Sequence, residues 1–344
     1  MTENKGREVW LDGLKGFGIL LVILGHVLSG YLDAWTFPEA FFSFYPVRTW
    51  IYSFHMPLFF CLSGFVSAKI LSMKRKERQS YVISRARRLL VPYFVIGLLY
   101  IPLKLRMSDM AVRPFSVQDI WKILIGQNPD VSLWFLYILF LIELICAVLV
   151  NTYNFRSIWY GSFFLSVAIY WANLDLRTAK YLFFFLMGIW VRLKFEDSRK
   201  AGYEDAMDGQ DLLAFLALVT DIFAIVFLYR TTITVTMMLT SLCGIYLVLW
   251  VSSRLVYNID GEKRKLGRGT GWLLLLGLYS MDIYILHEPI MTAVKIVLWN
   301  RLGWNYIVCT FLIFLCALCL PIPLSKWIIR KIKPLRILLL GEAK

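Results

Sequence analysis

Three residues near the start of the chain could do chemistry together if they lie on one helix: Asp12, Lys15 and His26. Lys15 and His26 are eleven positions apart, so at about 100° per residue both side chains project from the same side of a helix, about 16 Å apart along its axis. Asp12 falls within about 40° of the same stripe. An imidazole suits general-base chemistry near neutral pH, and a carboxylate beside an ammonium suits an ion pair.

The stretch between Lys15 and His26 is apolar, which places His26 about halfway into a hydrophobic helix. An ionisable side chain at that depth is costly and by default indicates a functional site facing a bundle interior or a wet cavity. The alternative is a neutral His26 hydrogen-bonded to a neighbouring helix, with Asp12 and Lys15 marking the membrane surface.

The chain has three histidines, His26, His55 and His287, and all of them fall inside apolar runs. This distribution indicates a polar centre within a helical bundle. His55 and His287 also have a simpler explanation, because each stands two residues before a proline. Proline removes a backbone donor and leaves a carbonyl that an imidazole could satisfy.

A polar stripe accompanies the last histidine, since Ser280, Tyr284 and His287 are spaced i, i+4, i+7 on one helical face. Asp282 and Glu288 add two carboxylates to the same run. If these carboxylates face the interior of a bundle they need partners, for which His26 and Lys15 are candidates.

A metal site is not expected from this pattern. No two histidines have the i, i+4 spacing of a helical zinc motif, and all three lie on separate elements. The six cysteines fall inside apolar runs and are interpreted as reduced packing residues. Cys316 and Cys319 have C-x-x-C spacing, but no polar residue or histidine accompanies them.

The composition predicts a polytopic membrane protein. The 344 residues are 59% hydrophobic and 16% aromatic, with a mean hydropathy of +0.65, and they divide into runs long enough to cross a bilayer. The net charge of +14 could indicate nucleic-acid binding, but the basic residues lie between the predicted spans and set topology instead.

The apolar runs predict an all-α bundle of about ten transmembrane spans, which forms one domain over residues 1–344 without a separate soluble domain. With the amino terminus in the cytoplasm, the inner segments hold 26 basic residues and the outer segments hold nine, so both termini are predicted to be cytoplasmic. No cleavage site follows the first apolar run, which is expected to remain as a signal anchor. The predicted spans are 13–32, 50–70, 89–104, 132–150, 157–173, 180–193, 211–229, 232–252, 271–298 and 305–328.

Two connections between the predicted spans carry further signals. The outer connection 105–131 contains a stretch from Phe115 that could form a short interfacial helix. The inner connection 72–88 is strongly basic, and its first charges are explained by topology and by anionic lipid heads. Arg85 and Arg88 abut the next span and could reach a ligand at its inner mouth.

Five short motifs run in order from residue 12 to residue 287. They are Asp12, Lys15 and His26; His55–Phe60 with Ser63 and Gly64; Arg85, Arg88, Pro92 and Tyr93; Leu133–Leu136; and Ser280, Ile283, Tyr284 and His287. Together they resemble the integral-membrane acyltransferases of family 3, which O-acylate surface sugars and related molecules. The chain is most similar to the stand-alone sugar O-acetylase branch. One departure is Lys15, where the family usually has arginine, because lysine lacks the planar fork that binds phosphate or carboxylate in two places.

The resemblance implies acetyl-CoA as the acyl donor, with Lys15, Arg85 and Arg88 binding its phosphates on the cytoplasmic side. The extended pantetheine arm, roughly 15–20 Å long, matches the distance of about 16 Å between Lys15 and His26 along the helix. His26 is then expected to be the catalytic general base that removes the proton of the acceptor hydroxyl. Direct transfer and an acyl-histidine intermediate both remain open.

The acceptor side is expected to contain Trp134, Tyr284 and His287, because sugars commonly stack on aromatic rings. Three further residues complete the predicted substrate-binding set: Asp12, His55 and Ser63. Asp12 lies too far along the helix to orient His26 and is expected to pair with Lys15 or a nearby arginine.

The expected acceptor is a cell-surface glycan or its lipid-linked precursor, in a bacterial inner membrane. Acyl-CoA and membrane lipids are the other expected partners, nucleic acid is not, and the oligomeric state is open. The alternative function is a transporter or flippase of a lipid-linked sugar or polysaccharide, because transporters also place ionisable groups near the membrane midplane. The sequence has no repeated pair of broken helices in corresponding halves, which disfavours this alternative.

Overall fold

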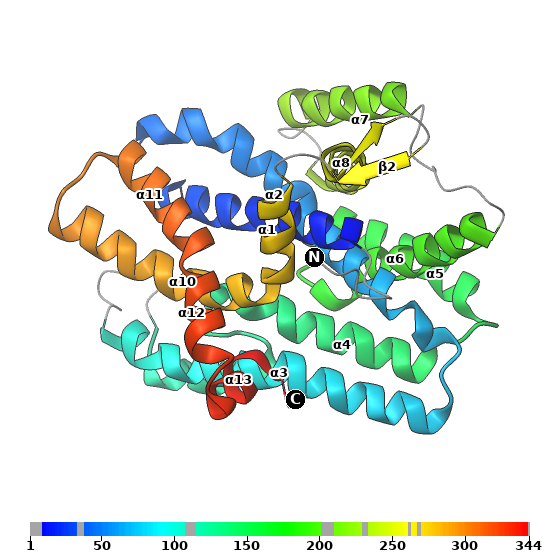
Figure 1. Cartoon of the computed structure of the whole chain (residues 1–344), viewed down its shortest axis with the longest axis horizontal. Helices are drawn as coiled ribbons and strands as arrows, with labels where there is room; N and C mark the ends of the chain where they lie inside the picture. The colour runs from blue at the N-terminus through cyan, green and yellow to red at the C-terminus, as the bar shows by residue number, and fades with distance from the viewer. Residues whose placement is uncertain are drawn as a thin grey trace.

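The computed structural model describes residues 9–32, 38–106, 115–200, 210–228, 233–260, 263–266 and 270–342. Almost all of the described chain is helical, as the sequence predicts (Figure 1). The α-helices are α1 (Val9–Leu32), α2 (Pro38–Ser67), α3 (Arg75–Arg106), α4 (Trp134–Leu149), α5 (Phe155–Trp171), α6 (Arg177–Lys200), α7 (Asp211–Phe223), α8 (Ile233–Val256), α9 (Gly271–Leu278), α10 (Ser280–Lys295), α11 (Tyr306–Cys319), α12 (Pro321–Leu324) and α13 (Lys333–Leu340).

Shorter elements connect or extend these helices. They are the 3₁₀ helices η1 (Ala68–Leu71), η3 (Val117–Ile125) and η4 (Val131–Leu133), the π-helical segments η5 (Ala224–Leu228), η6 (Ile296–Arg301) and η7 (Ser325–Ile329), and the strands β1 (Tyr257–Asp260) and β2 (Lys263–Leu266). The two strands pair antiparallel, with Tyr257 opposite Leu266. This hairpin is the exception to the all-α prediction among the described residues.

The first helix lies inside the bundle. α1 packs against α2, α8, α9, α10 and α11, and 72% of its most apolar 18-residue window is buried (Figure 1). A helix that is apolar on all sides is typical of such an interior position. The stripe of Asp12, Lys15 and His26 is therefore surrounded by other helices rather than by lipid.

Two pairs of glycines bring helices into backbone contact. A Cβ atom at Gly16 would overlap the carbonyl of Leu273, and one at Gly277 would overlap the carbonyl of Asp12, so α1 and α9 touch without intervening side chains. Small residues permit such close helix packing in membranes, where dispersion contacts hold helices together. In the same way Gly64 and Gly188 bring α2 against α6.

Five helical segments of the described chain are long and apolar enough to span a membrane, and a sixth is added if α9 and α10, which meet at 78°, form one broken span. The described residues therefore have the character of a multi-pass membrane protein. The prediction of ten spans is not confirmed. Four of the predicted spans coincide with α5, α6, α7 and α8, which are shorter or more polar than the other five. The sidedness of the termini stays a prediction.

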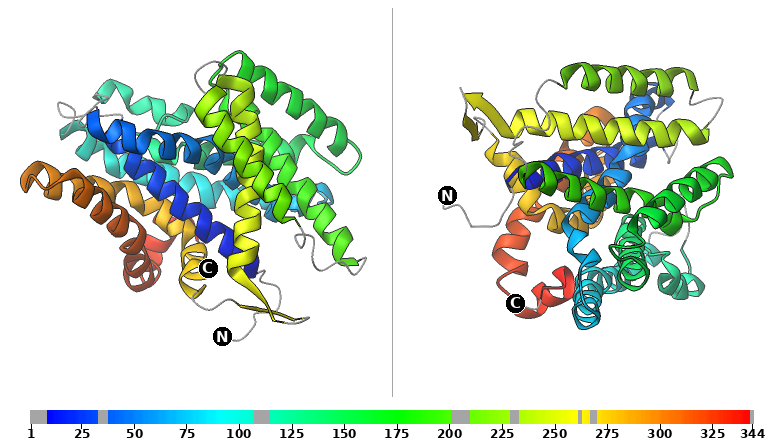
Figure 2. Two further views of the ribbon diagram at one scale, coloured as in Figure 1. Left: turned by 90° about the horizontal axis from the view of Figure 1, so that it is seen from above. Right: turned by 90° about the vertical axis from the view of Figure 1, so that its right-hand side faces the viewer.

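α7 lies at the edge of the molecule against α8, as the second view in Figure 2 shows. Its buried face is narrow and consists of Ala214, Ala217 and Asp221. Most of its large apolar side chains are exposed, including Leu212 and Phe215, which suits a helix that faces lipid.

Three element boundaries differ from the prediction. The inner connection 72–88 is helical from Arg75 onward, because its Arg, Lys, Glu and Gln residues are good helix formers. The second helix begins at Pro38, twelve residues before the predicted span 50–70. The predicted span 271–298 is broken at Tyr279 between α9 and α10.

The outer connection contains a short helix, η3, at the place where an interfacial helix was expected. Ser116 and Asp119 form a reciprocal capping box at its start, and Lys122 donates a hydrogen bond to Asp119 at 2.6 Å. This lysine and the amide and hydroxyl of Ser116 lower the pKa of the Asp119 carboxyl to about 2. The capped turn is therefore expected to persist in mild acid.

Candidate active site

A cavity of about 1100 Å³ opens between the helices and contains most of the predicted binding residues. Seven cationic and three acidic side chains line it, which makes its polar end strongly basic. The cations are Lys15, Lys69, Arg85, Arg88, Arg156, Arg192 and Arg330, and the acids are Asp12, Glu196 and Asp282. The predicted donor-binding residues Lys15, Arg85 and Arg88, from α1 and α3, thus share one cavity.

The other end of the cavity approaches the predicted catalytic residues. Ser63 and Tyr284 line the cavity, whereas His26, His55, Trp134 and His287 do not. Each of these four residues nevertheless lies within one helical turn of a lining residue. Those neighbouring lining residues are Val22, Met56, Phe135 and Tyr284, respectively.

Asp12 and Lys15 face the cavity together from the first turns of α1. The Lys15 ammonium lies 4.0 Å from the Asp12 carboxylate, and the two side chains are 32% and 13% exposed. The i, i+3 spacing on one helix places them side by side. This pair matches the expected position of Asp12, which is too far along the helix to touch His26.

Arg85 is held by a buried carboxylate that sequence reasoning missed. Its Nε lies 3.3 Å from Glu143 on α4, a residue only 2% exposed, and its Nη2 donates to the Ser67 hydroxyl at 3.1 Å. The hydroxyl of Tyr81 also donates to Ser67, at 3.0 Å. The available signal was a lone carboxylate inside the apolar run 134–149, because such a residue needs a cationic partner.

The three histidines come together in the folded protein. The ring centroids of His26 and His287 are 5.1 Å apart. The ring of Tyr52 connects His26 to His55, because its centroid lies 6.2 Å from that of His26 and 4.8 Å from that of His55. Tyr52 was not among the predicted site residues, although it precedes His55 by three positions on the same helix face. The α1, α2 and α10 helices thus build one polar centre.

The hydrogen bonds of two histidines define their tautomers. Nδ1 of His287 lies 2.6 Å from the carbonyl oxygen of Tyr284, and Nδ1 of His55 lies 2.8 Å from that of Ile51. A carbonyl only accepts, so both Nδ1 atoms carry a hydrogen, and in the neutral ring Nε2 is then the acceptor. Nε2 of His287 is buried and has no hydrogen-bond partner among the described residues.

The simpler explanation for His55 agrees with one side of its ring. Nδ1 bonds to the carbonyl of Ile51, one turn back on the same helix. Pro57 removes the amide that would bond to the carbonyl of Ser53, and this carbonyl can accept a hydrogen bond from the Ser241 hydroxyl at 2.7 Å, which also lies 2.6 Å from the Met237 carbonyl. The Nε2 side of His55 is available for other contacts.

A carboxylate accompanies the histidine cluster. One oxygen of Glu288 and one ring nitrogen each of His26 and His287 all lie within 4.8 Å of one another. These three residues could hold a metal ion, which the sequence did not predict; the ligand atoms of a tetrahedral zinc ion lie about 3.4 Å apart. A nearby carboxylate can also stabilise an imidazolium through its charge.

A second carboxylate, Asp130, lies just before α4 and is fully buried. It caps η4 by accepting from the amide and hydroxyl of Ser132, at 3.0 and 2.6 Å. The hydroxyl of Tyr284 donates to the Ser132 carbonyl, which ties α10 to this loop. Burial raises the pKa of the Asp130 carboxyl, because the charged form loses its hydration.

Trp134 takes part in an aromatic cluster outside the cavity. The Arg177 guanidinium lies 4.8 Å from its ring centroid, and the rings of Tyr181 and Phe60 lie at 5.6 and 6.3 Å. Trp134 thus has a cation–π contact with Arg177 and a tilted ring contact with Tyr181. Among the described residues Trp134 has no ring contact with Tyr284 or His287, and its predicted role on the acceptor side stays a prediction.

The fold and the site define a class of protein: a multi-pass membrane protein in which a basic cavity leads toward intramembrane histidines. The acyltransferase domain family model matches residues 8–328, so the chain belongs to this family. The chain is also similar to the nodulation protein NolL of Mesorhizobium japonicum, with 32% identity over 160 residues. That match covers 46% of the chain and 39% of NolL, so the chain matches less than half of this relative's length. No solved structure matches the chain.

Proposed function

We propose that the protein transfers an acyl group, acetyl in the first instance, from cytoplasmic acyl-CoA to a hydroxyl of a cell-surface glycan or its lipid-linked precursor. The observation that supports this proposal is the single cavity, which has Lys15, Arg85 and Arg88 at its basic end and lining residues adjoining the histidines at the other. Membership of the acyltransferase family favours this function over the transport of a lipid-linked sugar.

The donor fits the cavity in charge and in length. Lys15, Arg85 and Arg88 offer charge-assisted hydrogen bonds to the donor's phosphates. The pantetheine arm then extends past Val22 and Tyr284 toward His26, about 16 Å from Lys15 along α1. A cavity of about 1100 Å³ is large enough for a cofactor-sized ligand.

His26 acts in this proposal as the general base. It removes the proton of the acceptor hydroxyl while the oxygen attacks the acyl carbonyl, a C–O bond forms and the C–S bond breaks. The proton then passes from His26 to the thiolate, which leaves as CoA. Glu288, within 4.8 Å of His26, stabilises the imidazolium during the transfer.

His287 has a positioning role in the same step. Its Nε2 is an unpartnered acceptor beside His26, so it can accept the hydrogen of one His26 ring nitrogen. The other nitrogen of His26 is then unprotonated and faces the acceptor. An acyl-histidine on His26 would use the same geometry, and direct transfer is the simpler route.

The acceptor and the location follow from the family and the chemistry of the site. Tyr284, which lines the cavity, and His287 are the residues proposed for the acceptor side, with His55 and Ser63 as further contacts. The nodulation protein relative comes from a bacterium, which supports a bacterial inner membrane. Trp134 stays a predicted acceptor contact outside this proposed set, because its ring contacts Arg177 and Tyr181.

The test is calorimetric titration of purified protein in nanodiscs with CoA and acetyl-CoA. Lys15→Ala should weaken CoA binding about tenfold to a hundredfold, since a charge-assisted hydrogen bond contributes about 1.5–3 kcal/mol in a partly buried site. His26→Ala should bind CoA normally and transfer no acyl group. Lys76→Ala is the matched control, because Lys76 is an exposed α3 cation outside the cavity lining. Absence of CoA binding to folded wild-type protein would overturn the proposal.

A further inference from the structure

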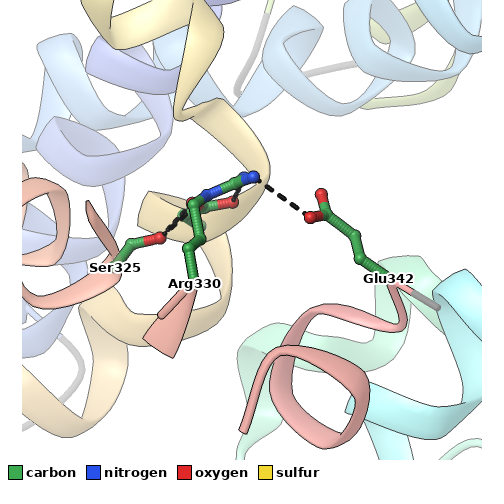
Figure 3. A network of polar contacts seen from close by, with 4 residues as sticks. Ser325, Arg330 and Glu342 are labelled. Carbon is green, nitrogen blue, oxygen red and sulfur yellow. Dashed lines mark hydrogen bonds and ion pairs between the residues drawn. The ribbon is translucent and has the colours of Figure 1, made fainter. Parts of the chain in front are cut away.

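Arg330, which lines the basic end of the cavity, is held in place by two carboxylates from different parts of the chain. Figure 3 shows it between Ser325 and Glu342, at the junction of η7 with the end of the chain. Its Nε and Nη2 each donate to Asp282 at 3.0 Å, and its Nη1 donates to Glu342 at 3.1 Å. The hydroxyl of Ser325 donates to Asp282 as well.

The two carboxylates differ in how firmly they are placed. Asp282 lies on α10 and is 2% exposed, so its fork-to-fork pairing fixes one edge of the Arg330 guanidinium. Glu342 is 25% exposed and follows the last helix, α13. It holds only the remaining edge of the guanidinium, through a single ion pair of the kind that contributes little in a solvated setting.

The tail that carries Glu342 lies on the donor-binding helix. Gly341 has φ +65 and ends α13, and a Cβ atom there would lie 2.5 Å from the carbonyl oxygen of Arg87 and from Cα of Arg88. This left-handed turn and the close approach both require glycine. The tail therefore crosses α3 where the predicted donor ligand Arg88 enters the cavity.

We propose that Arg330 is a further ligand for the phosphate groups of the donor and that Glu342 occupies its open edge until phosphate displaces it. The inference rests on the acyl-CoA function proposed above. Asp282 keeps the guanidinium oriented during the exchange. The N–H group of Arg330 that donates to Glu342 then donates to a phosphate oxygen instead. Because phosphate carries more charge than a carboxylate and can accept two hydrogen bonds from the guanidinium edge where Glu342 accepts one, the exchange favours the ligand. Glu342 is a positioning residue, and donor binding releases the tail from Arg330.

The experiment compares wild-type protein with Glu342→Gln by calorimetry, using CoA and phosphate-free pantetheine as probes. Removal of the competing carboxylate should raise CoA affinity about twofold to fivefold, the range expected for a partly exposed ion pair. Pantetheine affinity should not change. Glu77→Gln is the matched control, because it removes one negative charge from an exposed position at the start of α3 without touching Arg330.

A double-mutant cycle tests the link to Arg330. Asp282→Asn combined with Arg330→Gln removes both partners, so no buried carboxylate is left without its cation. This protein should bind CoA about tenfold more weakly, and adding Glu342→Gln should have no further effect. An equal gain in CoA affinity with Glu342→Gln and Glu77→Gln would overturn the inference, and so would a gain that survives the loss of Arg330. In either case CoA binding by the wild type leaves the proposed function intact. Absence of CoA binding to folded wild type would overturn both.

Discussion

His287→Asn is expected to separate the structural hydrogen bond of this histidine from its part in catalysis. In the folded protein Nδ1 of His287 donates to the Tyr284 carbonyl at 2.6 Å, whereas Nε2 is buried without a partner among the described residues. The side-chain amide nitrogen of asparagine lies at about the same distance from Cα as Nδ1. The substitution therefore keeps the bond to Tyr284 and removes Nε2.

The free energy of unfolding should change little. A buried polar atom without a partner costs about 1–3 kcal/mol, and removing Nε2 recovers part of this cost. The small cavity left by the missing ring atoms costs about 1 kcal/mol, at ~24 cal/mol per Å³. These effects oppose each other, so His287→Asn should unfold within about 1–2 kcal/mol of the wild type.

The rate of acyl transfer should fall much further, by about 10²–10⁴-fold, because a general base whose tautomer is no longer fixed loses most of its contribution. A loss of this size raises the activation barrier by about 3–5 kcal/mol, which exceeds the expected change in stability. CoA affinity should stay the same, because His287 does not line the cavity. His287→Gln is the matched variant, since its side-chain oxygen can accept a hydrogen bond near the Nε2 position and should restore part of the rate.

The assay follows labelled acetyl from acetyl-CoA into envelope glycan in membranes that contain each variant, alongside unfolding of the purified proteins. Wild-type transfer by His287→Asn would refute the role of Nε2. So would a loss of rate that merely follows a loss of folded protein, or equal rates for the asparagine and glutamine variants.

Three further outcomes are expected. Glu143→Gln should lower the free energy of unfolding by about 2–3 kcal/mol in chemical denaturation, because it leaves the partly buried guanidinium of Arg85 without its carboxylate. Unchanged stability would contradict the ion pair. Gly277→Ala should destabilise the protein by about 3 kcal/mol or more, because its Cβ atom would overlap the backbone of Asp12. Gly271→Ala is the control, since its Cβ position has open space around it, and this variant should melt as the wild type does. The Asp119 carboxyl should titrate near pH 2 in carboxyl-selective carbon-13 NMR. Its contribution to stability should be present above pH 4 and lost as the pH falls through 2. An ordinary titration near pH 4 would show that the capping box is not formed.

Local spacing was sufficient for the parts of the site that lie on one helix. The i, i+3 pair of Asp12 and Lys15 lies at 4.0 Å on α1, as helical geometry predicts. Tyr284 and His287 share α10, where their rings are 5.8 Å apart. Glu288 lies beside His26, which was one of the two partners expected for a carboxylate in that run.

Partners from distant helices could not be predicted in the same way. His26 and Lys15 were the candidate partners for Asp282, but Asp282 pairs with Arg330, 48 positions away. A buried carboxylate in such a bundle needs a cation or hydrogen-bond donors, and many of both were available, so only the tertiary arrangement selects the partner. Ser241, whose hydroxyl can donate to the carbonyl that Pro57 leaves open, is likewise distant in sequence.

The break between α9 and α10 has a similar cause. The run 271–298 is apolar and contains no proline near its bend, so periodicity predicts one continuous helix. The bend follows directly after Gly277, whose backbone contacts that of Asp12 on α1. Because this contact lies between helices, the run itself carries no signal of the break.

Two of the five arginines that line the cavity, Arg85 and Arg330, share an arrangement that bears on the lysine at position 15. Arg85 and Arg330 are each fixed by a carboxylate that is 2% exposed, Glu143 and Asp282, respectively. A guanidinium held in this way loses little further freedom when it binds a phosphate, which favours affinity. The ammonium of Lys15 sits on a flexible stem beside Asp12 and acts as a point charge. In the proposed donor site, Arg85 on α3 and Arg330 directly after η7 would supply the bidentate recognition that an arginine would supply at position 15, so lysine there is compatible with the proposal.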